Sequence, residues 1–560
     1  METLIKYKDS GVKNMNSSKF EDAITDFTKV IDGLEPNNEE EAILKMTCLS
    51  NRSGCYLAVA KREEASKDAT EIINIYQKFR PEEIQAKMTN EQIKEDKLTF
   101  LLSLAFVRRG NVFESQIQLL EALQQYAQAV TLDFDGAGQM GMRSILNRLG
   151  VPQFDQDDPE LKPFSELLAL LLDPTSLLTD LVGITKAANE SVMDANLLKK
   201  LNSTGCCRIL YAVIQLYLGE EMLVLASLVA IRALVEHGVG DLFAQALITR
   251  AVVQNWGQNA PIMGAVLMFL RLLPQQLLPS LNAVDFIDPI LKSLDLELKE
   301  DEQEAAYYLL FHLMEKEEHL LKVGIEGGIS KAISAKSKGS LIFLSKACQL
   351  RQNVRMLETE NGGPDWIFDL ISKNADNLTV LSATSILITQ IFMGAADDKE
   401  HNLPTPPIEE LKKRAEKTYS LMFPAATKFA KEADLVSNLF AALASCVEFA
   451  TDYIHQNRGI QAASAILMLN DKDEGCALNI ISFLYACVTS GLVEDVKKTR
   501  SAMPTVMKAL QQHANNLLLV ERAVAIACEV DNPKKLELLK PALEQNPSSP
   551  ILAKYSSLLV

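Results

Sequence analysis

The feature that most limits the fold is a regular alternation along residues 164–560. Apolar helical patterns of 10 to 18 residues are separated there by short breaks rich in Gly, Pro, Asp and Asn. The apolar–polar alternation of a half-buried strand is missing from this segment. The stretches 206–218 and 222–237 are apolar on most of their faces, so each must be buried between neighbours. The pattern predicts stacked helices in which each unit contacts only its neighbours.

The length and charge of the chain narrow the choice of architecture and of partner. Its 560 residues exceed what one hydrophobic core supports, so it must divide into domains or grow as a repeat structure. Aromatic residues make up only 6%, which favours aliphatic helix faces as the core. The net charge is -17. Since nucleic acids and anionic membranes bind basic surfaces, we expect neither as a partner.

Three observations predict a cytoplasmic protein without a membrane anchor. Residues 1–6 lack the apolar core of a secretion signal. The apolar runs 222–231 and 261–270 end at Arg232 and Arg271, short of the roughly 18 to 20 residues that span a bilayer. The nine cysteines are odd in number and lie mostly in apolar runs, which is typical of reduced thiols in a core.

The first 132 residues contain three predicted helical pairs. Their ranges are 6–16 with 19–32, 42–59 with 63–76, and 97–108 with 112–132. The second helix of the third pair is expected to be about two turns longer than the second helix of the 34-residue helical repeat that the first pair resembles. Small and aromatic residues in the first pair follow the spacing of the 34-residue tetratricopeptide (TPR) repeat: Tyr7, Ser10, Gly11, Ala23, Phe27 and Pro36. The region therefore resembles three TPR repeats.

Further along, glycine pairs precede a short helix, a polar turn and a long apolar helix. Such runs begin at Gly327-Gly328 and at Gly362-Gly363, and a similar run begins at Gly459. They resemble armadillo repeats, whose period is about 40 to 47 residues. We therefore expect an all-α fold, with TPR helical hairpins followed by an armadillo/HEAT-like right-handed superhelical solenoid. The expected domains are a TPR domain at 1–135, a linker or capping segment at 136–163, and the armadillo-like solenoid at 164–560.

Three residues suggest a binding site in the TPR region. TPR modules of heat-shock co-chaperones hold the C-terminal carboxylate of a chaperone through Lys and Asn four apart, a second Asn, and Lys and Arg four apart. The resemblance assigns these roles to Lys8, Asn51 and Lys97, whereas Val12 and Leu101 stand where Asn and Arg are expected. Two ammonium groups and an amide can still bind a carboxylate, although loss of a bidentate Arg weakens binding.

Two alternatives to this clamp stay open at the level of sequence. In the first, Lys8 and Lys97 are solvated helix residues and Asn51 is a structural amide. In the second, Arg108 and Arg109 supply the missing cation.

The order of the two regions resembles the UCS family of myosin chaperones and the TPR-armadillo factors that assist dynein assembly. This resemblance implies a non-enzymatic co-chaperone. Its TPR groove would bind the acidic C-terminal tail of a heat-shock chaperone, and its solenoid would hold a client such as myosin or another motor protein. The alternative is a structural scaffold adaptor with no chaperone partner, which the changes at Val12 and Leu101 favour.

Three other patterns are interpreted as structural. Gly136 to Gly141 match G-x-G-x-x-G, but no strand precedes them, so we expect a flexible interdomain turn and no cofactor. His312, Glu315 and His319 could share a helix face, but their charged neighbours favour a solvated helix and no metal. The residues four beyond Trp256 and Trp366 are Ala260 and Leu370, rather than the Asn of nuclear-import receptors, which favours core packing. No catalytic motif is found, so we expect no enzyme activity.

Overall fold

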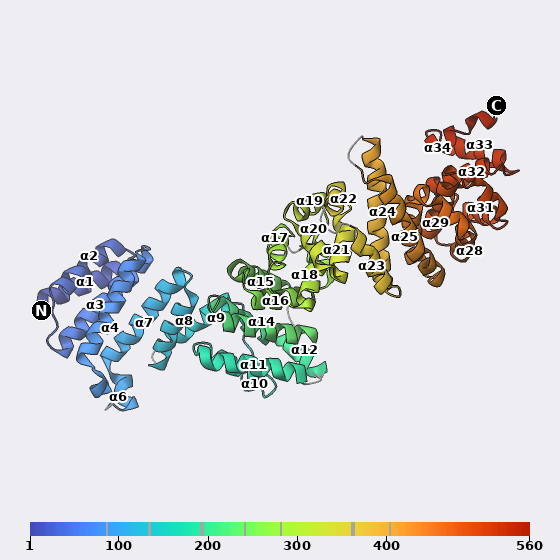
Figure 1. The fold of residues 1–560 in the computed structure, drawn as a ribbon. Coiled ribbons are helices and arrows are strands. Elements are labelled where there is room, and N and C mark those ends of the chain that lie inside the picture. Colours follow the sequence, from blue (N-terminus) through green and yellow to red (C-terminus); the bar gives the residue numbers. More distant parts are fainter. Residues whose placement is uncertain are drawn as a thin grey trace. The chain divides into compact units, whose positions relative to one another are not determined.

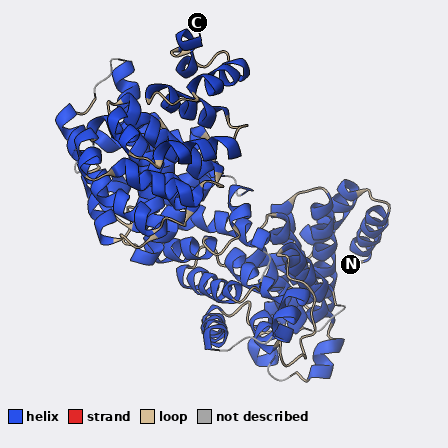
Figure 2. Cartoon of the chain, turned by 90° about the vertical axis from the view of Figure 1, so that its right-hand side faces the viewer, coloured by secondary structure: helices blue, strands red, loops and turns tan. Residues whose placement is uncertain are grey.

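The computed structural model describes residues 1–85, 88–132, 136–190, 195–239, 242–280, 283–359, 364–401 and 405–559. These residues form helices joined by short loops, and they contain no strand (Figure 2). The predicted all-α class is thus confirmed. Contacts divide the chain into two compact units, Met1–Gly257 and Gln258–Val560, which are described separately.

The first unit begins with three antiparallel helical pairs (Figure 1). They are α1 (Glu2–Asn16) with α2 (Phe20–Asp32), α3 (Glu39–Ala58) with α4 (Arg62–Phe79), and α7 (Lys97–Ser115) with α8 (Leu119–Thr131). The short helices α5 (Glu82–Gln85) and α6 (Asn90–Glu95) lie between the second and third pairs. The unit continues through α9 (Ala137–Arg148), α10 (Lys162–Ala169), α11 (Pro174–Glu190), α12 (Ala195–Thr204), α13 (Ile209–Leu216), α14 (Glu221–Glu236) and α15 (Leu242–Trp256).

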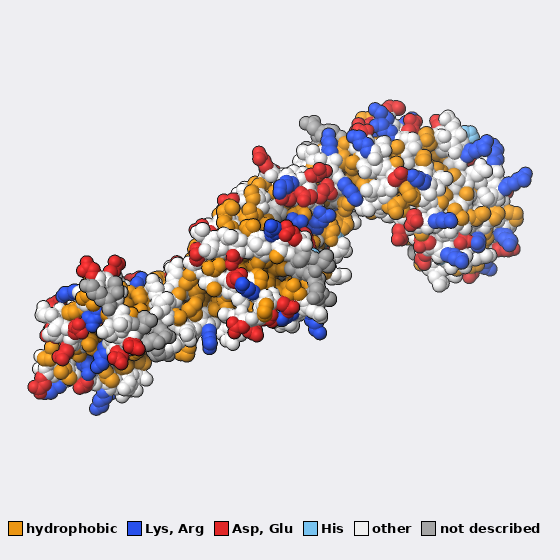
Figure 3. Space-filling model, turned by 90° about the horizontal axis from the view of Figure 1, so that it is seen from below, with side chains coloured by type: hydrophobic (Ala, Val, Ile, Leu, Met, Phe, Trp, Pro, Cys, Tyr) orange, Lys and Arg blue, Asp and Glu red, His pale blue; other side chains and the backbone are white. Residues whose placement is uncertain are grey.

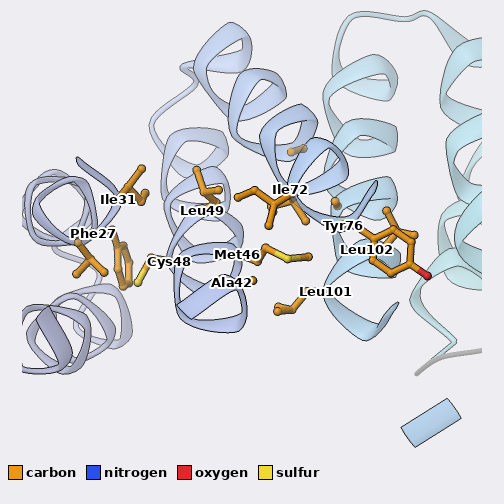
Figure 4. Packing of buried hydrophobic residues seen from close by; sticks show 14 of the residues in the cluster. Phe27, Ile31, Ala42, Met46, Cys48, Leu49, Ile72, Tyr76, Leu101 and Leu102 are labelled. Carbon is orange, nitrogen blue, oxygen red and sulfur yellow. The ribbon is translucent and has the colours of Figure 1, made fainter. Parts of the chain in front are cut away.

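Apolar side chains from successive pairs form one core in the TPR region. Figure 4 shows side chains of α2, α3, α4 and α7 meeting there, among them Phe27, Met46, Ile72 and Leu102. Phe27, Met46 and Ile72 are fully buried. Burying one such side chain contributes roughly 1.5 to 3 kcal/mol, so this shared core makes the pairs a single stack.

The third pair differs from its prediction. The first helix does not end at Arg108 but continues to Ser115, and α8 has 13 residues, the same number as α2. The predicted turn and the predicted longer second helix are therefore wrong. Gly110 lies inside α7, at the contact with α8. A Cβ at this position would approach the Tyr126 ring to 2.5 Å, so only glycine allows α7 and α8 to pack this closely.

The glycine-rich segment 136–141 also differs from its prediction. Gly136, with a positive φ of 72°, caps the N-terminus of α9, and the following glycines lie inside that helix. A Cβ on Gly138 would lie 2.9 Å from the carbonyl oxygen of Tyr126, and one on Gly141 would overlap the Tyr126 ring. The glycines thus serve helix packing rather than a flexible turn, and α9 stacks on α7 and α8.

The second unit contains repeated groups of two or three helices. They are α16 (Ala260–Leu270), α17 (Ala283–Ser293), α18 (Glu300–Leu313), α19 (Glu317–Ile325), α20 (Gly328–Ala335), α21 (Lys338–Ala347), α22 (Arg351–Thr359), α23 (Asp365–Lys373), α24 (Leu378–Glu400), α25 (Ile408–Lys428), α26 (Ala433–Ser445), α27 (Thr451–Gln456), α28 (Gly459–Asn470), α29 (Glu474–Thr489), α30 (Val493–Lys498), α31 (Ala502–Gln512), α32 (Leu517–Glu529), α33 (Lys535–Gln545) and α34 (Pro550–Ala553).

One helix of each group contacts its counterpart in the next group. The resulting row runs through α18, α21, α24, α26, α29 and α32. The predicted Gly327-Gly328 start corresponds to the N-terminus of α20, where Gly327 has a φ of 78°. Gly362 and Gly363 lie outside the described residues. The division at Gly257 falls inside the segment 164–560, so the proposed three-domain boundaries stay a prediction.

One described helix, α24, is long and apolar enough to cross a membrane by length and composition. Most of the apolar stretch of α24 is buried inside the protein, where the helix packs between α21 and α26. Its C-terminal part carries the buried carboxylate of Asp398.

Candidate peptide-binding site

The first helices of the three TPR-like pairs lie next to one another. Helix α3 contacts α1 on one side and α7 on the other. The Asn38 side chain caps α3 by accepting a hydrogen bond from the backbone amide of Glu41 at 3.0 Å. Cys48, Asn51 and Cys55 follow the i, i+3, i+7 spacing of one helix face. Residues that approach this face from α1 and α7 form the candidate site.

Lys8 approaches this face from α1. Its side chain is 31% exposed and pairs with the more exposed Asp9 at 3.1 Å, an interaction that contributes little to stability. Burial raises the pKa of the Cys48 thiol to about 12, and the nearby positive charge of Lys8 opposes this rise. Lys8 therefore lies near Cys48, one helical turn before Asn51 on α3.

Arg108 approaches the same face from α7. Its guanidinium would lie 3.1 Å from a Cβ on Gly54, so the missing side chain at Gly54 makes room for it. Burial lowers the pKa of Arg108, and the neighbouring Cys55 opposes this effect. No carboxylate among the described residues forms an ion pair with Arg108. A half-buried cation without an ionic partner favours binding of an anion.

Asn51 is half-buried and lies on α3 between Cys48, which is near Lys8, and Gly54, which is near Arg108. By contrast, the neighbouring Arg52 is fully engaged, because its Nε and Nη2 donate to the Asp68 carboxylate at 2.9 and 2.7 Å. Its Nη1 donates to the Thr28 hydroxyl at 2.8 Å. Arg52 thus holds α2, α3 and α4 together, while Asn51 is left available for a ligand.

The structure places Lys97 elsewhere. It is the exposed first residue of α7, eleven residues before Arg108, which corresponds to about 16 Å along a helix. Leu101, at the position expected for Arg, is only 6% exposed and belongs to the core. Of the predicted set, Lys8 and Asn51 lie at the same face of α3, and the second cation at this face is Arg108.

Sequence reasoning gave Arg108 only as an alternative. The sequence signal for Arg108 is its position two residues before Gly110. Gly110 marks the place where the first helix of this pair contacts the second helix. Arg109 itself lies against the ring of Phe113, at 5.9 Å from the ring centroid.

The residues of the predicted histidine grouping do not share one helix face. His312 lies near the end of α18 and His319 lies in α19, with a break between Leu313 and Glu317. His319 is buried, with 5% exposure, so the expected solvated helix is also wrong for this residue. Within the described ranges, no three His, Cys, Asp or Glu side chains are grouped so that they could hold a metal ion.

The remaining sequence predictions concern packing. Trp366 is 7% exposed, as predicted for core packing, whereas Trp256 is half-buried and its Nε1 donates to the Leu218 carbonyl at 2.7 Å. All nine cysteines are buried and free. On the face drawn in Figure 3, Lys and Arg side chains are interspersed with Asp and Glu rather than gathered into one basic patch.

No protein-family model matches the sequence, and no curated protein matches it. Solved structures similar to the chain include yeast Tom70, at 12% identity and a TM-score of 0.20, covering 100% of this chain and 94% of that chain. Another is the myosin chaperone UNC-45 from C. elegans in complex with a Hsp90 peptide, at 12% identity and a TM-score of 0.24, covering 99% and 73%. A third is the APC/C hetero-tetramer Cut9-Hcn1, at 10% identity and a TM-score of 0.25, covering 98% and 95%. Similarity at this level assigns no partner to the chain.

Proposed function

We propose that this chain is a cytoplasmic, non-enzymatic co-chaperone whose TPR groove binds the acidic C-terminal tail of a heat-shock chaperone. The observation that carries the proposal is the Arg108 guanidinium, which forms no ion pair with any described residue and which approaches, as Lys8 does, the face of α3 that carries Asn51. Arg108, and not Lys97, supplies the second cation in this site.

The chemistry of the three side chains suits a terminal carboxylate. A guanidinium donates two parallel hydrogen bonds to one carboxylate, an ammonium adds a point charge, and an amide donates one further hydrogen bond. Capture of a C-terminal carboxylate is a recurring mode of peptide recognition. Partial burial of Arg108 strengthens each interaction because the local dielectric constant is lower than that of water.

The solenoid-like helices that follow the TPR pairs are proposed to hold a client protein, such as myosin or another motor. Stacked helical repeats offer extended binding surfaces. The nine buried free cysteines are compatible with a reducing compartment. A scaffold adaptor without a chaperone partner is the competing function.

The test is a titration of the full chain with an acidic peptide that matches the C-terminus of a heat-shock chaperone. The peptide is used with a free carboxylate and with an amidated C-terminus. We expect the free-acid peptide to bind, and Lys8→Ala and Arg108→Gln each to weaken binding by about tenfold or more, in line with the loss of a charge-assisted hydrogen bond.

Lys97→Gln is the matched control, because it removes a cation from the same helix about 16 Å away. Equal binding of the amidated peptide, or unchanged binding by the Lys8→Ala and Arg108→Gln variants, would contradict the proposed site. A wild-type chain that binds neither peptide would favour the scaffold function.

A further inference from the structure

A groove of about 770 Å³ crosses the row of helices in the second unit. It runs from α18 over α21 and α24 to the N-termini of α26 and α29, and every residue that lines it belongs to this unit. We call it the central groove. Its volume lies within the range of known ligand sites, roughly 300 to 1,000 Å³.

The floor of the central groove is apolar. Phe311 of α18, Ile342 of α21 and Ile386 of α24 each line it, so successive helices each contribute a large apolar side chain. All three are half-buried and therefore partly open to solvent. An occupant that crosses these helices must present apolar side chains at intervals.

Three carboxylates lie at the α26–α29 end of the central groove. They belong to Glu432, Asp434 and Asp473. One Asp473 oxygen caps α29 by accepting from the Cys476 amide at 2.8 Å. Burial raises the pKa of the Cys476 thiol to about 12, and the charges of Asp473 and Asp434 add to the rise, which indicates that both carboxylates lie near Cys476. No Lys or Arg in the described part of the chain forms an ion pair with any of the three.

The opposite end of the central groove carries a cation. The Lys346 ammonium lies 4.9 Å from the centroid of the Phe311 ring. Burial lowers the pKa of Lys346, and the charge of Glu315 opposes this effect. The central groove is therefore polarised, with negative charge at the α26–α29 end and positive charge at the α18–α21 end.

We propose that the central groove binds an extended client segment in which apolar side chains alternate with lysine or arginine, an inference that specifies the client of the function proposed above. The basic side chains lie toward Glu432, Asp434 and Asp473, and the end of the segment near Lys346 is neutral or acidic. An extended segment suits a groove that crosses helices, because alternate side chains point to one face. With helix axes about 8 to 10 Å apart and about 3.3 Å per residue, five helices accommodate about ten to twelve residues.

The test uses the full chain and three synthetic twelve-residue peptides, followed by fluorescence anisotropy at 150 mM salt. In the first peptide, leucine alternates with arginine over one half and with serine over the other half, so that the half near Lys346 is neutral. The second has glutamate in place of each arginine, and the third has serine in place of each leucine. We expect only the first peptide to bind.

The critical variant is Glu432→Gln with Asp434→Asn and Asp473→Asn, which removes three charges while asparagine keeps the cap on α29. The matched control is Asp369→Asn with Glu448→Gln and Asp452→Asn, three exposed residues outside the central groove. Both variants change the net charge equally, so general attraction to the acidic chain affects both alike. Thermal unfolding followed by circular dichroism checks that each variant folds.

We expect the groove variant to bind the leucine–arginine peptide about tenfold more weakly than the wild type. This is the combined effect expected from the loss of three partly exposed ion pairs. The control variant should bind as the wild type does. Equal weakening in both variants, equal binding of the glutamate or serine peptide, or no binding of any peptide overturns the proposal. Titration of the same samples with the acidic C-terminal peptide tests the TPR site separately, because Lys8 and Arg108 lie in the other unit.

Discussion

The buried carboxylate of Asp398 allows a quantitative test of what holds the second unit together. Its side chain is 1% exposed and pairs with two arginines of α22, Arg351 and Arg355. The Nε atoms of Arg351 and Arg355 donate to Asp398 Oδ1 at 3.3 and 3.2 Å. These hydrogen bonds and charges lower the pKa of Asp398 from 3.8 to about 2. The carboxylate thus fixes α22 against α24.

The size of this effect follows from the change in pKa. A difference of one in pKa between the folded and unfolded states corresponds to about 1.36 kcal/mol. The ionised carboxylate therefore stabilises the native state by about 2.4 kcal/mol relative to the neutral acid. Removing one member of a fully buried pair costs about 3 to 5 kcal/mol, but the Arg355 side chain is 44% exposed and recovers hydration. We therefore expect Asp398→Asn, which resembles the neutral acid, to destabilise the contact between α22 and α24 by about 2 to 3 kcal/mol.

Native-state hydrogen exchange measures this local contact without assuming that the whole chain unfolds in one step. In Asp398→Asn, amides of α22 and of the C-terminal half of α24 should exchange about 60-fold faster, and those of α32 should not change. Asp397→Asn is the control, since Asp397 is 54% exposed and pairs with His401 at 3.3 Å. Similar exchange rates in the two variants would refute the assignment.

The pH dependence has a defined sign. Because the folded-state pKa of Asp398 lies below its unfolded value, the stabilisation is complete above about pH 4 and is lost as the pH falls through about 2. The difference in stability between the wild type and Asp398→Asn should therefore shrink over this interval. A difference that stays constant down to pH 2 would mean that the Asp398 charge is not its cause.

Three further predictions concern the first unit and the cysteines. Gly110→Ala should destabilise the first unit by about 1 to 3 kcal/mol in thermal unfolding, because its Cβ would meet the Tyr126 ring, whereas Gly183→Ala, with open space around it, should be neutral or slightly stabilising. Gly54→Ala should displace the Arg108 guanidinium and weaken binding of an acidic C-terminal peptide in a titration without altering the helical content; unchanged affinity would place Arg108 outside the site. Cys48 and Cys476, whose pKa values burial raises to about 12, should resist maleimide labelling at pH 7.5 until urea is added, and mass spectrometry of the labelled peptides checks this.

The helical pairs of the first unit could be predicted because their periodicity and turns are local. The first predicted pair, 6–16 with 19–32, corresponds to α1 and α2; α1 begins four residues earlier, at Glu2, and α2 begins one residue later, at Phe20. Gly110 and Gly141 could not be placed inside helices, because glycine costs about 1 kcal/mol in an isolated helix and is commonly found at breaks. At Gly110 and Gly141 the contact with Tyr126 outweighs this cost. Such a contact depends on a residue of another helix, and local sequence does not contain it.

The misplaced cation of the candidate site has the same origin. When Gly110 is interpreted as a turn, the first helix of the third pair spans only 97–108, and Lys97 lies at its start. In the structure, Ser53 of α3 donates to the Ala65 carbonyl at 2.9 Å, and Gly110 of α7 contacts Tyr126, so both residues mark where a first helix meets its second helix. Asn51 and Arg108 each precede that contact by two residues. They therefore occupy equivalent positions on neighbouring helices, and for this reason Arg108, rather than Lys97, lies beside Asn51.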